Sequence, residues 1–311
     1  MYLIYDCLKN SPFSIATQQV LKHLNIPYTT LDANKSFKAH GGYFGRIGAL
    51  EQFIFANVYN IALASLEEKK LLALEEDSYA NLVFTLDLLR NNQSLRDFVV
   101  AELQSQSIIL DIDILQNHIA YFPAILANYM TEIEQSIKYS FGKNERNLPH
   151  ISPNNTTKGF SSCAFYGSRH ADCNMKGEYK HIEKLCKILG LTYLSKPFSL
   201  QSFTHLAHID SERAYQKSGD LLYEGIDLGV DFLCVFADST FDMFDNKQDL
   251  CTKYCKRDPI SIASLNMAQI LLVCFGKADE AGFETHKINP DFMSTIRLPK
   301  MLHSTIYCGD F

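Results

Sequence analysis

Short apolar segments alternate with amphipathic helical patterns along this chain, and the alternation occurs twice in the same order. In each half, a polar turn that opens a helix follows the third apolar segment. The expected strands are residues 1–6, 26–32 and 69–74 in the first half, and 162–166, 191–195 and 231–236 in the second. Alternation of this kind is typical of parallel sheets with helices on both faces. The sequence therefore predicts the α/β class, with two pseudo-repeated domains that are each a parallel sheet flanked by helices.

The expected helices fill the intervals between these strands and continue beyond the last of them. Their apolar periods cover residues 11–24, 46–66, 78–90, 93–103, 114–140, 176–189, 211–228, 239–254 and 264–275. We expect the pattern over 114–140 to be broken or kinked near Pro123. Between the halves, residues 142–159 contain two prolines and four asparagines and show no apolar period. This composition is typical of a linker or a long surface loop. We expect a first domain at 1–141, the linker at 142–159 and a second domain at 160–311.

Composition excludes several functional classes. With 311 residues, of which 47% are hydrophobic, the chain is long enough for one large core or for two domain cores of ordinary size. No apolar run reaches the roughly 20 residues of a membrane-spanning helix, and the first residues lack the basic region of a secretory signal. The formal net charge of −6 argues against a general nucleic-acid surface. We expect a cytoplasmic protein with no membrane span and no nucleic-acid partner, of undetermined oligomeric state.

The polar residues that follow the strands mark the expected site. In open parallel sheets, ligands bind at the carboxyl ends of the strands, where the first amides of the following helices are free. Cys7 and Glu75 hold such positions in the first half, and Ser168 and Asp238 hold them in the second. We therefore expect two facing crevices, one at the strand ends of each domain.

The same positions carry a resemblance to a known family. They are Cys7, Ala39-His40-Gly41 and Glu75-x-x-Ser78, then Gly167-Ser168 with His170, the segment 204–208, and Ala237-x-x-Thr240. In order and spacing, nearly the whole chain resembles the cysteine-rich, two-domain component of heterodisulfide reductase, a family known for its paired CCG motifs. The resemblance implies iron–sulfur ligands at these points. In this chain, Cys7 is the only ligand cysteine that is retained.

The loss of these cysteines bears on the cofactor. An iron–sulfur cluster is held by several converging cysteine thiolates, which serine, threonine and alanine do not replace. We therefore predict that the chain holds no iron–sulfur cluster, has no other cofactor and does not carry out heterodisulfide chemistry.

Three hypotheses about function follow, of which we adopt the first as our prediction and keep the second as its alternative. In the first, the chain is a non-catalytic interaction or assembly partner of a redox system and binds another protein of a redox complex. In the second, it is a metalloprotein or oxidoreductase with a rebuilt site. The groups that would converge in that site are His40, Glu75 and Cys7 in one half, and His170, His205 or His208, and Asp238 in the other. In the third, Cys7 is a nucleophile at a helix N-terminus and His40 is its base.

The state of the pocket distinguishes these hypotheses. An open pocket lined by His40, Glu75 and Cys7 would favour the rebuilt site, whereas a crevice filled by side chains would favour the interaction partner. Exposed apolar surface on one face would also support a partner. Helix capping is the simpler interpretation of the acidic turns. The candidate pocket residues, none of them assigned a catalytic or metal-binding role, are Cys7, His40, Gly41, Glu75, Ser78, Ser168, His170, His205, His208, Asp238 and Thr240.

Overall fold

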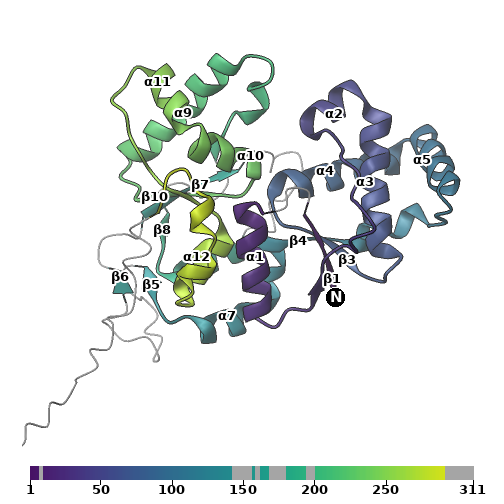
Figure 1. The fold of residues 1–311 in the computed structure, drawn as a ribbon, viewed down its shortest axis with the longest axis horizontal. Helices are drawn as coiled ribbons and strands as arrows, with labels where there is room; N and C mark the ends of the chain where they lie inside the picture. Colours follow the sequence, from purple (N-terminus) through teal and green to yellow (C-terminus); the bar gives the residue numbers. More distant parts are fainter. Residues whose placement is uncertain (7–9, 142–155, 158–161, 168–179, 194–199, 291–311) are drawn as a thin grey trace, which may run out of the picture.

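The computed structural model describes residues 1–6, 10–141, 156–157, 162–167, 180–193 and 200–290. These residues form two parallel sheets with helices packed around them, which confirms the predicted α/β class (Figure 1). The strands of the first sheet lie in the order β2-β1-β3-β4. Those of the second lie in the order β11-β10-β7-β8, and β9 also pairs with β7. The two sheets have the same strand order. The order β2-β1-β3-β4 of the first corresponds to β8-β7-β10-β11 of the second, with β9 left aside.

The first half contains the first sheet and the helices on its faces. Its elements are β1 (Tyr2–Tyr5), α1 (Pro12–His23), β2 (Tyr28–Thr29), α2 (Gly42–Gly48), α3 (Leu50–Ser65), β3 (Lys70–Ala73), α4 (Glu76–Asn91), α5 (Gln93–Ser105), η1 (Ile112–His118), β4 (Ile119–Tyr121), α6 (Phe122–Ile125), η2 (Leu126–Tyr129), α7 (Met130–Ser136) and β5 (Ser140–Phe141).

The second half contains the second sheet and the remaining helices. Its elements are β6 (Thr156–Thr157), β7 (Ser162–Gly167), α8 (Lys180–Leu189), β8 (Thr192–Tyr193), β9 (Leu200–Gln201), η6 (Thr204–Leu206), α9 (Ser211–Asp227), β10 (Phe232–Val235), α10 (Asp238–Phe241), the π-helical turn η7 (Asp242–Asn246), α11 (Gln248–Cys255), β11 (Ser264–Leu265), α12 (Met267–Cys274), η8 (Ala278–Glu280) and η9 (Phe283–Thr285).

The predicted helix over 46–66 is wrong in detail, because two helices occupy this stretch. Helix α2 ends at Gly48 and α3 begins at Leu50. Ala49 between them has φ −149° and ψ 62°, which lies outside the helical region. The start of α2 is set by Gly41, whose φ of 72° is a left-handed conformation that glycine adopts without strain. The change of direction at Ala49 is therefore what turns α2 away from α3.

The predicted helical pattern over 114–140 is broken near Pro123, as expected, but the residues just before the break form a strand instead of a helix. Its first residues belong to η1, after which the chain forms β4 and pairs in parallel with β3. Helical structure resumes with α6, in whose first turn Pro123 lies, and ends with α7 at Ser136. An apolar strand of three residues has the same local pattern as a buried helical turn, so periodicity alone does not separate them.

Two further predicted helices begin or continue differently. The stretch 239–254 is divided into α10, η7 and α11. In the stretch 264–275, the first two residues form β11, and α12 starts only after Asn266. The side chains of Asn266 and Gln269 form a capping box that fixes this start.

The hydrophobic core crosses from one half to the other. Helices α1 and α12 lie side by side in the centre of the molecule (Figure 1). One apolar cluster contains Val20 of α1 and Ile4 of β1 together with Leu271 of α12 and Phe232 of β10. The domain limits at 141 and 160 stay a prediction, because residues 142–155 and 158–161 lie outside the described residues. Within the described part of the chain, no helix is both long and apolar enough to cross a membrane.

Candidate functional site

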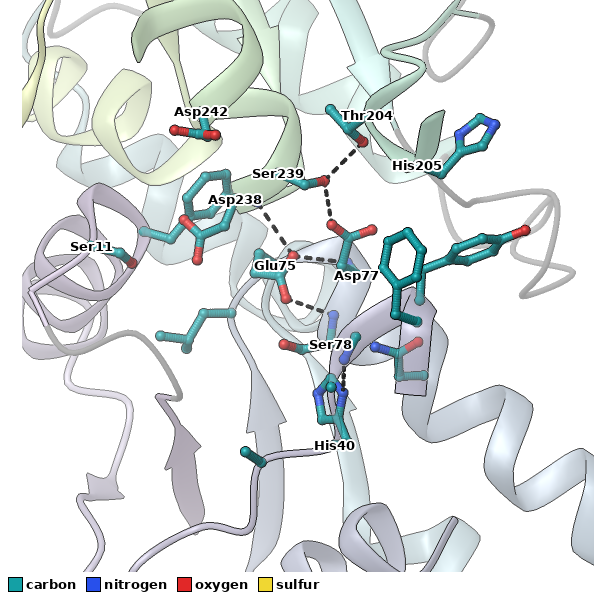
Figure 2. A pocket seen from close by; sticks show the side chains of 18 of the residues that line it. Ser11, His40, Glu75, Asp77, Ser78, Thr204, His205, Asp238, Ser239 and Asp242 are labelled. Carbon is teal, nitrogen blue, oxygen red and sulfur yellow. Dashed lines mark hydrogen bonds between the residues drawn. The ribbon is translucent and has the colours of Figure 1, made fainter. Parts of the chain in front are cut away.

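One pocket of about 640 Å³ lies where the strand ends of the two sheets meet. Its walls include the turn from β3 to α4 in the first half and the turn from β10 to α10 in the second (Figure 2). The loop that leads into α2 and the η6 region complete the walls. The structure thus places one shared pocket at the strand ends instead of the two separate crevices that we expected, because the first turns of α4 and α10 contact each other.

Glu75 joins the two halves at this pocket. It is the N-cap of α4, where its Oε1 accepts from Ser78 N at 2.6 Å and its Oε2 from Asp77 N at 2.8 Å. The same Oε2 accepts the backbone N–H of Asp238, the first residue of α10, at 3.4 Å. One capping side chain therefore serves the first turns of two helices from opposite halves.

Further hydrogen bonds hold the two turns together. Glu76 N donates to Phe236 O at 2.7 Å. Ser239 Oγ donates to Asp77 Oδ2 at 2.5 Å, and Thr204 Oγ1 donates to Ser239 Oγ at 3.3 Å (Figure 2). Because each of the first two bonds has one partner in each half, the geometry of the pocket depends on the docking of both.

Burial perturbs two carboxyl groups of the pocket. Burial, followed by the nearby acids Asp77 and Asp238, raises the pKa of Glu75 to about 8, against the effect of its N–H donors. Burial likewise raises the pKa of Asp238 to about 7. The acids Asp77, Asp6 and Asp242 add to this shift. Near neutral pH, both groups therefore have substantial protonated populations.

His40 lines the pocket from a turn that depends on glycine. Its Nδ1 accepts from Gly42 N at 3.0 Å, so the proton of the neutral ring is on Nε2. Gly41 has a left-handed φ of 72°. A Cβ on Gly45 would lie 1.9 Å from His40 O, so only glycine lets α2 pack this closely against the turn.

Aromatic rings from both halves lie at the pocket. The ring of Tyr43 is 5.9 Å from that of His205, measured between centroids, and the ring of Phe44 is 4.7 Å from that of His208. Tyr43 and Phe44 are themselves 6.1 Å apart. We refer to these four residues as the aromatic rim. The rim links α2 to the η6 region across the gap between the halves.

Seven of the predicted pocket residues line this one cavity. They are His40, Gly41, Glu75, Ser78, His205, His208 and Asp238. Thr240 is not among them, because its side chain is buried and donates from Oγ1 to Ser202 Oγ at 2.9 Å. Cys7, Ser168 and His170 lie outside the described residues.

Other lining residues were not among the predicted ones. They include Asp6, Phe44, Asp77, Ser239 and Asp242. Asp77 and Ser239 lie in the same helix-opening turns as predicted residues, and capping was a sufficient explanation for them. Asp242 follows Asp238 by four residues, a spacing that places two side chains on one helical face. That spacing was a usable signal, and the acidity of the pocket is greater than the predicted set indicates.

The donor atoms of the pocket do not fit an iron–sulfur cluster. Its described lining residues offer carboxylates, imidazoles, hydroxyls and an amide, but no thiol, whereas such clusters are held mainly by cysteine thiolates. Across the described ranges, no group of three or more His, Cys, Asp and Glu side chains is arranged to hold a metal ion. His40 and Glu75 share the pocket without forming such a group.

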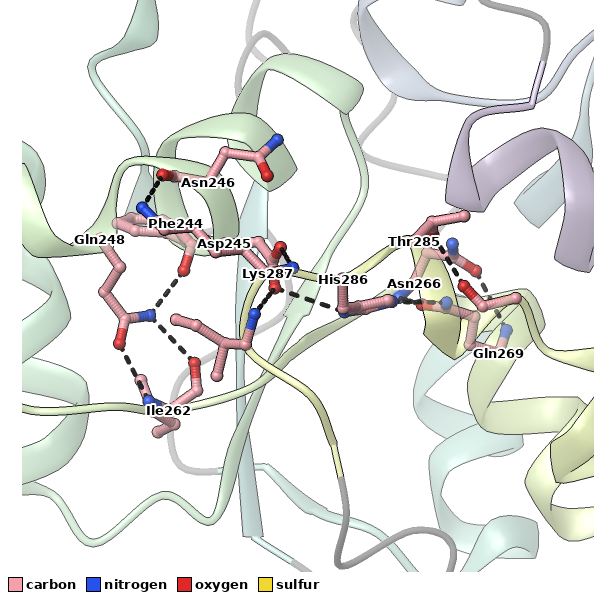
Figure 3. A network of polar contacts seen from close by, with 12 residues as sticks. Phe244, Asp245, Asn246, Gln248, Ile262, Asn266, Gln269, Thr285, His286 and Lys287 are labelled. Carbon is pink, nitrogen blue, oxygen red and sulfur yellow. Dashed lines mark hydrogen bonds and ion pairs between the residues drawn. The ribbon is translucent and has the colours of Figure 1, made fainter.

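A buried network of polar contacts connects η7, next to the pocket, to α12 and to the segment 286–288 (Figure 3). Asp245 in η7 accepts from Lys287 N at 2.7 Å and Ile288 N at 3.3 Å. Its Oδ1 also lies 3.3 Å from His286 Nδ1, and neither of these two side chains is exposed. His286 Nε2 lies 2.8 Å from Gln269 Nε2 in α12. The network connects α12 to η7, whose first residue lines the pocket.

Comparison with known proteins gives two findings. Residues 203–287 match the family described as the HdrB-like C-terminal domain. The crystal structure of a hypothetical protein from Helicobacter pylori is similar over 94% of this chain, with a TM-score of 0.73 and 22% sequence identity. This chain spans 52% of that longer chain, and the likeness shows the fold alone. No curated protein is significantly similar to the chain.

Proposed function

We propose that this chain, whose residues 203–287 match the HdrB-like C-terminal domain, is related to the cysteine-rich component of heterodisulfide reductase. We propose further that it binds a small molecule at its strand ends without an iron–sulfur cluster. The proposal develops the hypothesis of a rebuilt site. According to this hypothesis, the positions that hold iron–sulfur ligands in the resembled family still line a pocket here, but with other side chains. The role that we assign is binding, with no covalent change to the ligand.

The open pocket is the observation that supports this proposal. Its volume of about 640 Å³ falls within the range of roughly 300–1,000 Å³ that is usual for small-molecule sites. His40 and Glu75, two of the three residues expected to converge in a rebuilt site, both line it, and the third, Cys7, lies outside the described residues. A structural remnant of a lost cluster site would instead be filled by side chains, because empty volume costs stability.

The described cysteines support the absence of a cluster. Cys186, Cys234 and Cys274 are buried at positions that do not line the pocket. Burial raises the pKa of all three thiols. A protonated thiol is a poor nucleophile, and these three buried side chains pack as small apolar groups away from the pocket.

Filling the pocket tests the proposal. Ala39 lines the pocket, so Ala39→Trp is expected to reduce co-purifying small molecules at least about tenfold, since an indole removes much of the space. Both proteins should be purified without oxygen, and the compounds released by heat identified by mass spectrometry. Iron and acid-labile sulfide should be substoichiometric, and the protein colourless.

Ala101→Trp is the matched control, because Ala101 is exposed on α5 and does not line the pocket. It should retain the same compounds as the unaltered protein. Stoichiometric iron with sulfide would contradict the absence of a cluster. Equal amounts of released compounds from the Ala39 and Ala101 variants would show that the pocket is not the binding site.

A protein partner from a redox system is the second candidate function, and helix α2 favours it. This helix has no buried residue. Ile47 is 62% exposed, and Phe44 and Leu50 beside it are 37% and 36% exposed. Apolar side chains that gather on one exposed segment are typical of an interaction surface.

Co-expression with the products of neighbouring genes tests this second function. Ile47→Asp is expected to weaken a resulting complex at least about tenfold, because a charge at an apolar interface must be desolvated. Ile109→Asp is the control, since Ile109 is 85% exposed in the segment between α5 and η1. Co-elution in size-exclusion chromatography measures the complex. Equal loss in both variants, or none in either, would argue against docking at α2.

A further inference from the structure

The described lining of the pocket has an excess of acidic groups. Five of its residues are carboxylic acids, and none of the described ones is lysine or arginine. The five acids are Asp6, Glu75, Asp77, Asp238 and Asp242. An anionic ligand would meet like charge on entering, whereas a positively charged one would be attracted.

Two of these acids have hydroxyl donors within the protein. Asp77 accepts the hydroxyl of Ser239 at 2.5 Å. Asp6 accepts the hydroxyl of Ser14, also at 2.5 Å.

Two more acids have nitrogen donors. Glu75 accepts three backbone N–H groups. Asp242 pairs with Lys247 Nζ at 2.6 Å. With these donors in place, the four carboxyl groups have partners without any ligand.

Asp238 is the exception. Its carboxyl group is largely buried at the pocket wall, and no described residue donates a hydrogen bond to it. In Figure 2 it lies between Ser11 and Glu75 on the side of the pocket. The groups that perturb it are themselves acids, and together with burial they raise its pKa to about 7. Among the residues that the structure describes, ionised Asp238 therefore has no positive partner, and a cationic ligand would supply one.

The aromatic rim supplies the second element of recognition. Its rings Tyr43, Phe44, His205 and His208 all line the same cavity as Asp238. Phe13 and Leu74 add apolar surface to the lining. Aromatic faces attract organic cations, and apolar surface accommodates the body of such a molecule.

No described residue pairs with the Asp238 carboxylate, which lies in the same pocket as the aromatic rim. From this juxtaposition we propose that the pocket binds a small organic cation, an ammonium or guanidinium group on an apolar or aromatic body. This inference rests on the proposed function, because it names the ligand class of the same pocket. A bare metal ion fits less well, since the described residues include no group of three metal-binding side chains and the cavity is much larger than an ion.

A matched series of three probes tests the inference on the full chain. The probes are 2-phenylethylammonium, 2-phenylethanol and 3-phenylpropionate, which share an aromatic body and differ in charge. Isothermal titration calorimetry at neutral pH and low salt is expected to rank the cation at least about tenfold tighter than the alcohol, and the anion weakest. Asp238→Asn should remove the preference for the cation and leave the affinity for the alcohol within about twofold.

Asp249→Asn is the control variant, because Asp249 is exposed and pairs with Lys287 away from the pocket. It should retain the preference for the cation. Binding of the alcohol as tightly as the ammonium probe would overturn the charge selection and leave the binding pocket itself standing. If none of the three probes binds at millimolar concentration, and Ala39→Trp releases the same compounds as the unaltered protein, the pocket proposal fails as well. A cation preference that persists in Asp238→Asn would also overturn the inference.

Discussion

Raising the pH from about 6.5 to about 8.5 is expected to lower the free energy of unfolding by about 2 to 3 kcal/mol. The cause is the pair Glu75 and Asp238, whose pKa values rise to about 8 and about 7 on folding. A carboxyl group with a raised folded-state pKa contributes stability that is fully present below its unfolded-state pKa. That stability is lost as the pH rises through the folded-state value. Urea unfolding at a series of pH values measures the slope.

Other titrating groups change the free energy of unfolding mainly outside the range from about pH 6.5 to about pH 8.5. The folded-state pKa values of His23 and His181 are lowered, so their contribution is lost as the pH falls below the ordinary histidine range. The buried thiols have raised pKa values and act above this range. Asp238→Asn should reduce the slope, because the amide does not titrate. A stability that is flat or rises with pH in the unaltered protein would contradict the assignment of protons to these two carboxyl groups.

Replacing Asp245 with alanine is expected to lower the free energy of unfolding by about 3 to 5 kcal/mol. The carboxylate is fully buried, accepts hydrogen bonds from Lys287 N and Ile288 N, and lies 3.3 Å from His286 Nδ1. Its removal leaves two backbone N–H groups in the protein interior without their acceptor. Urea denaturation followed by circular dichroism measures the change, and the midpoint of thermal unfolding should fall with it.

Asp249→Ala is a control that removes a different acid from the same segment. Asp249 pairs with Lys287 Nζ at 3.1 Å, and its side chain is 67% exposed. An exposed pair contributes about 0 to 1 kcal/mol, so this variant should stay close to the unaltered protein. A similar loss of stability in both variants would show that the buried contacts of Asp245 do not stabilise the protein more than an exposed ion pair does. It would also contradict the role of this network in holding η7 in place.

The accuracy of the sequence predictions differed between elements for identifiable reasons. Strands β1, β3 and β10 lie where the apolar segments predicted them, because each is a short, largely apolar run bounded by polar turns. Strands β4 and β11 were assigned to helices. They are too short for their own period to be seen, and they become strands only because β3 and β10 offer a free edge.

The residues of the site likewise fall into those with a local sequence signal and those without one. His40, Glu75 and Asp238 were placed at strand ends by the order of elements, and the structure brings all three to one pocket. His205 and His208 of the aromatic rim were also predicted pocket residues, but their pairing with Tyr43 and Phe44 had no local signal. These pairs join α2 to residues more than a hundred positions away. Contacts of that range depend on how the two halves dock, which local periodicity does not encode.

By itself, the sequence determined the α/β class, the approximate positions of the main strands and the turns that open α4 and α10. These properties follow from local patterns of apolar residues and from capping groups within a few residues of each helix start. Only the tertiary structure decided that the two halves share one pocket. The bond from Asp238 N to Glu75 Oε2 spans 163 residues. That no described residue donates a hydrogen bond to the Asp238 carboxylate depends on how distant segments pack around it. Burial and pairing are collective results of packing, so they exist only once the chain is folded.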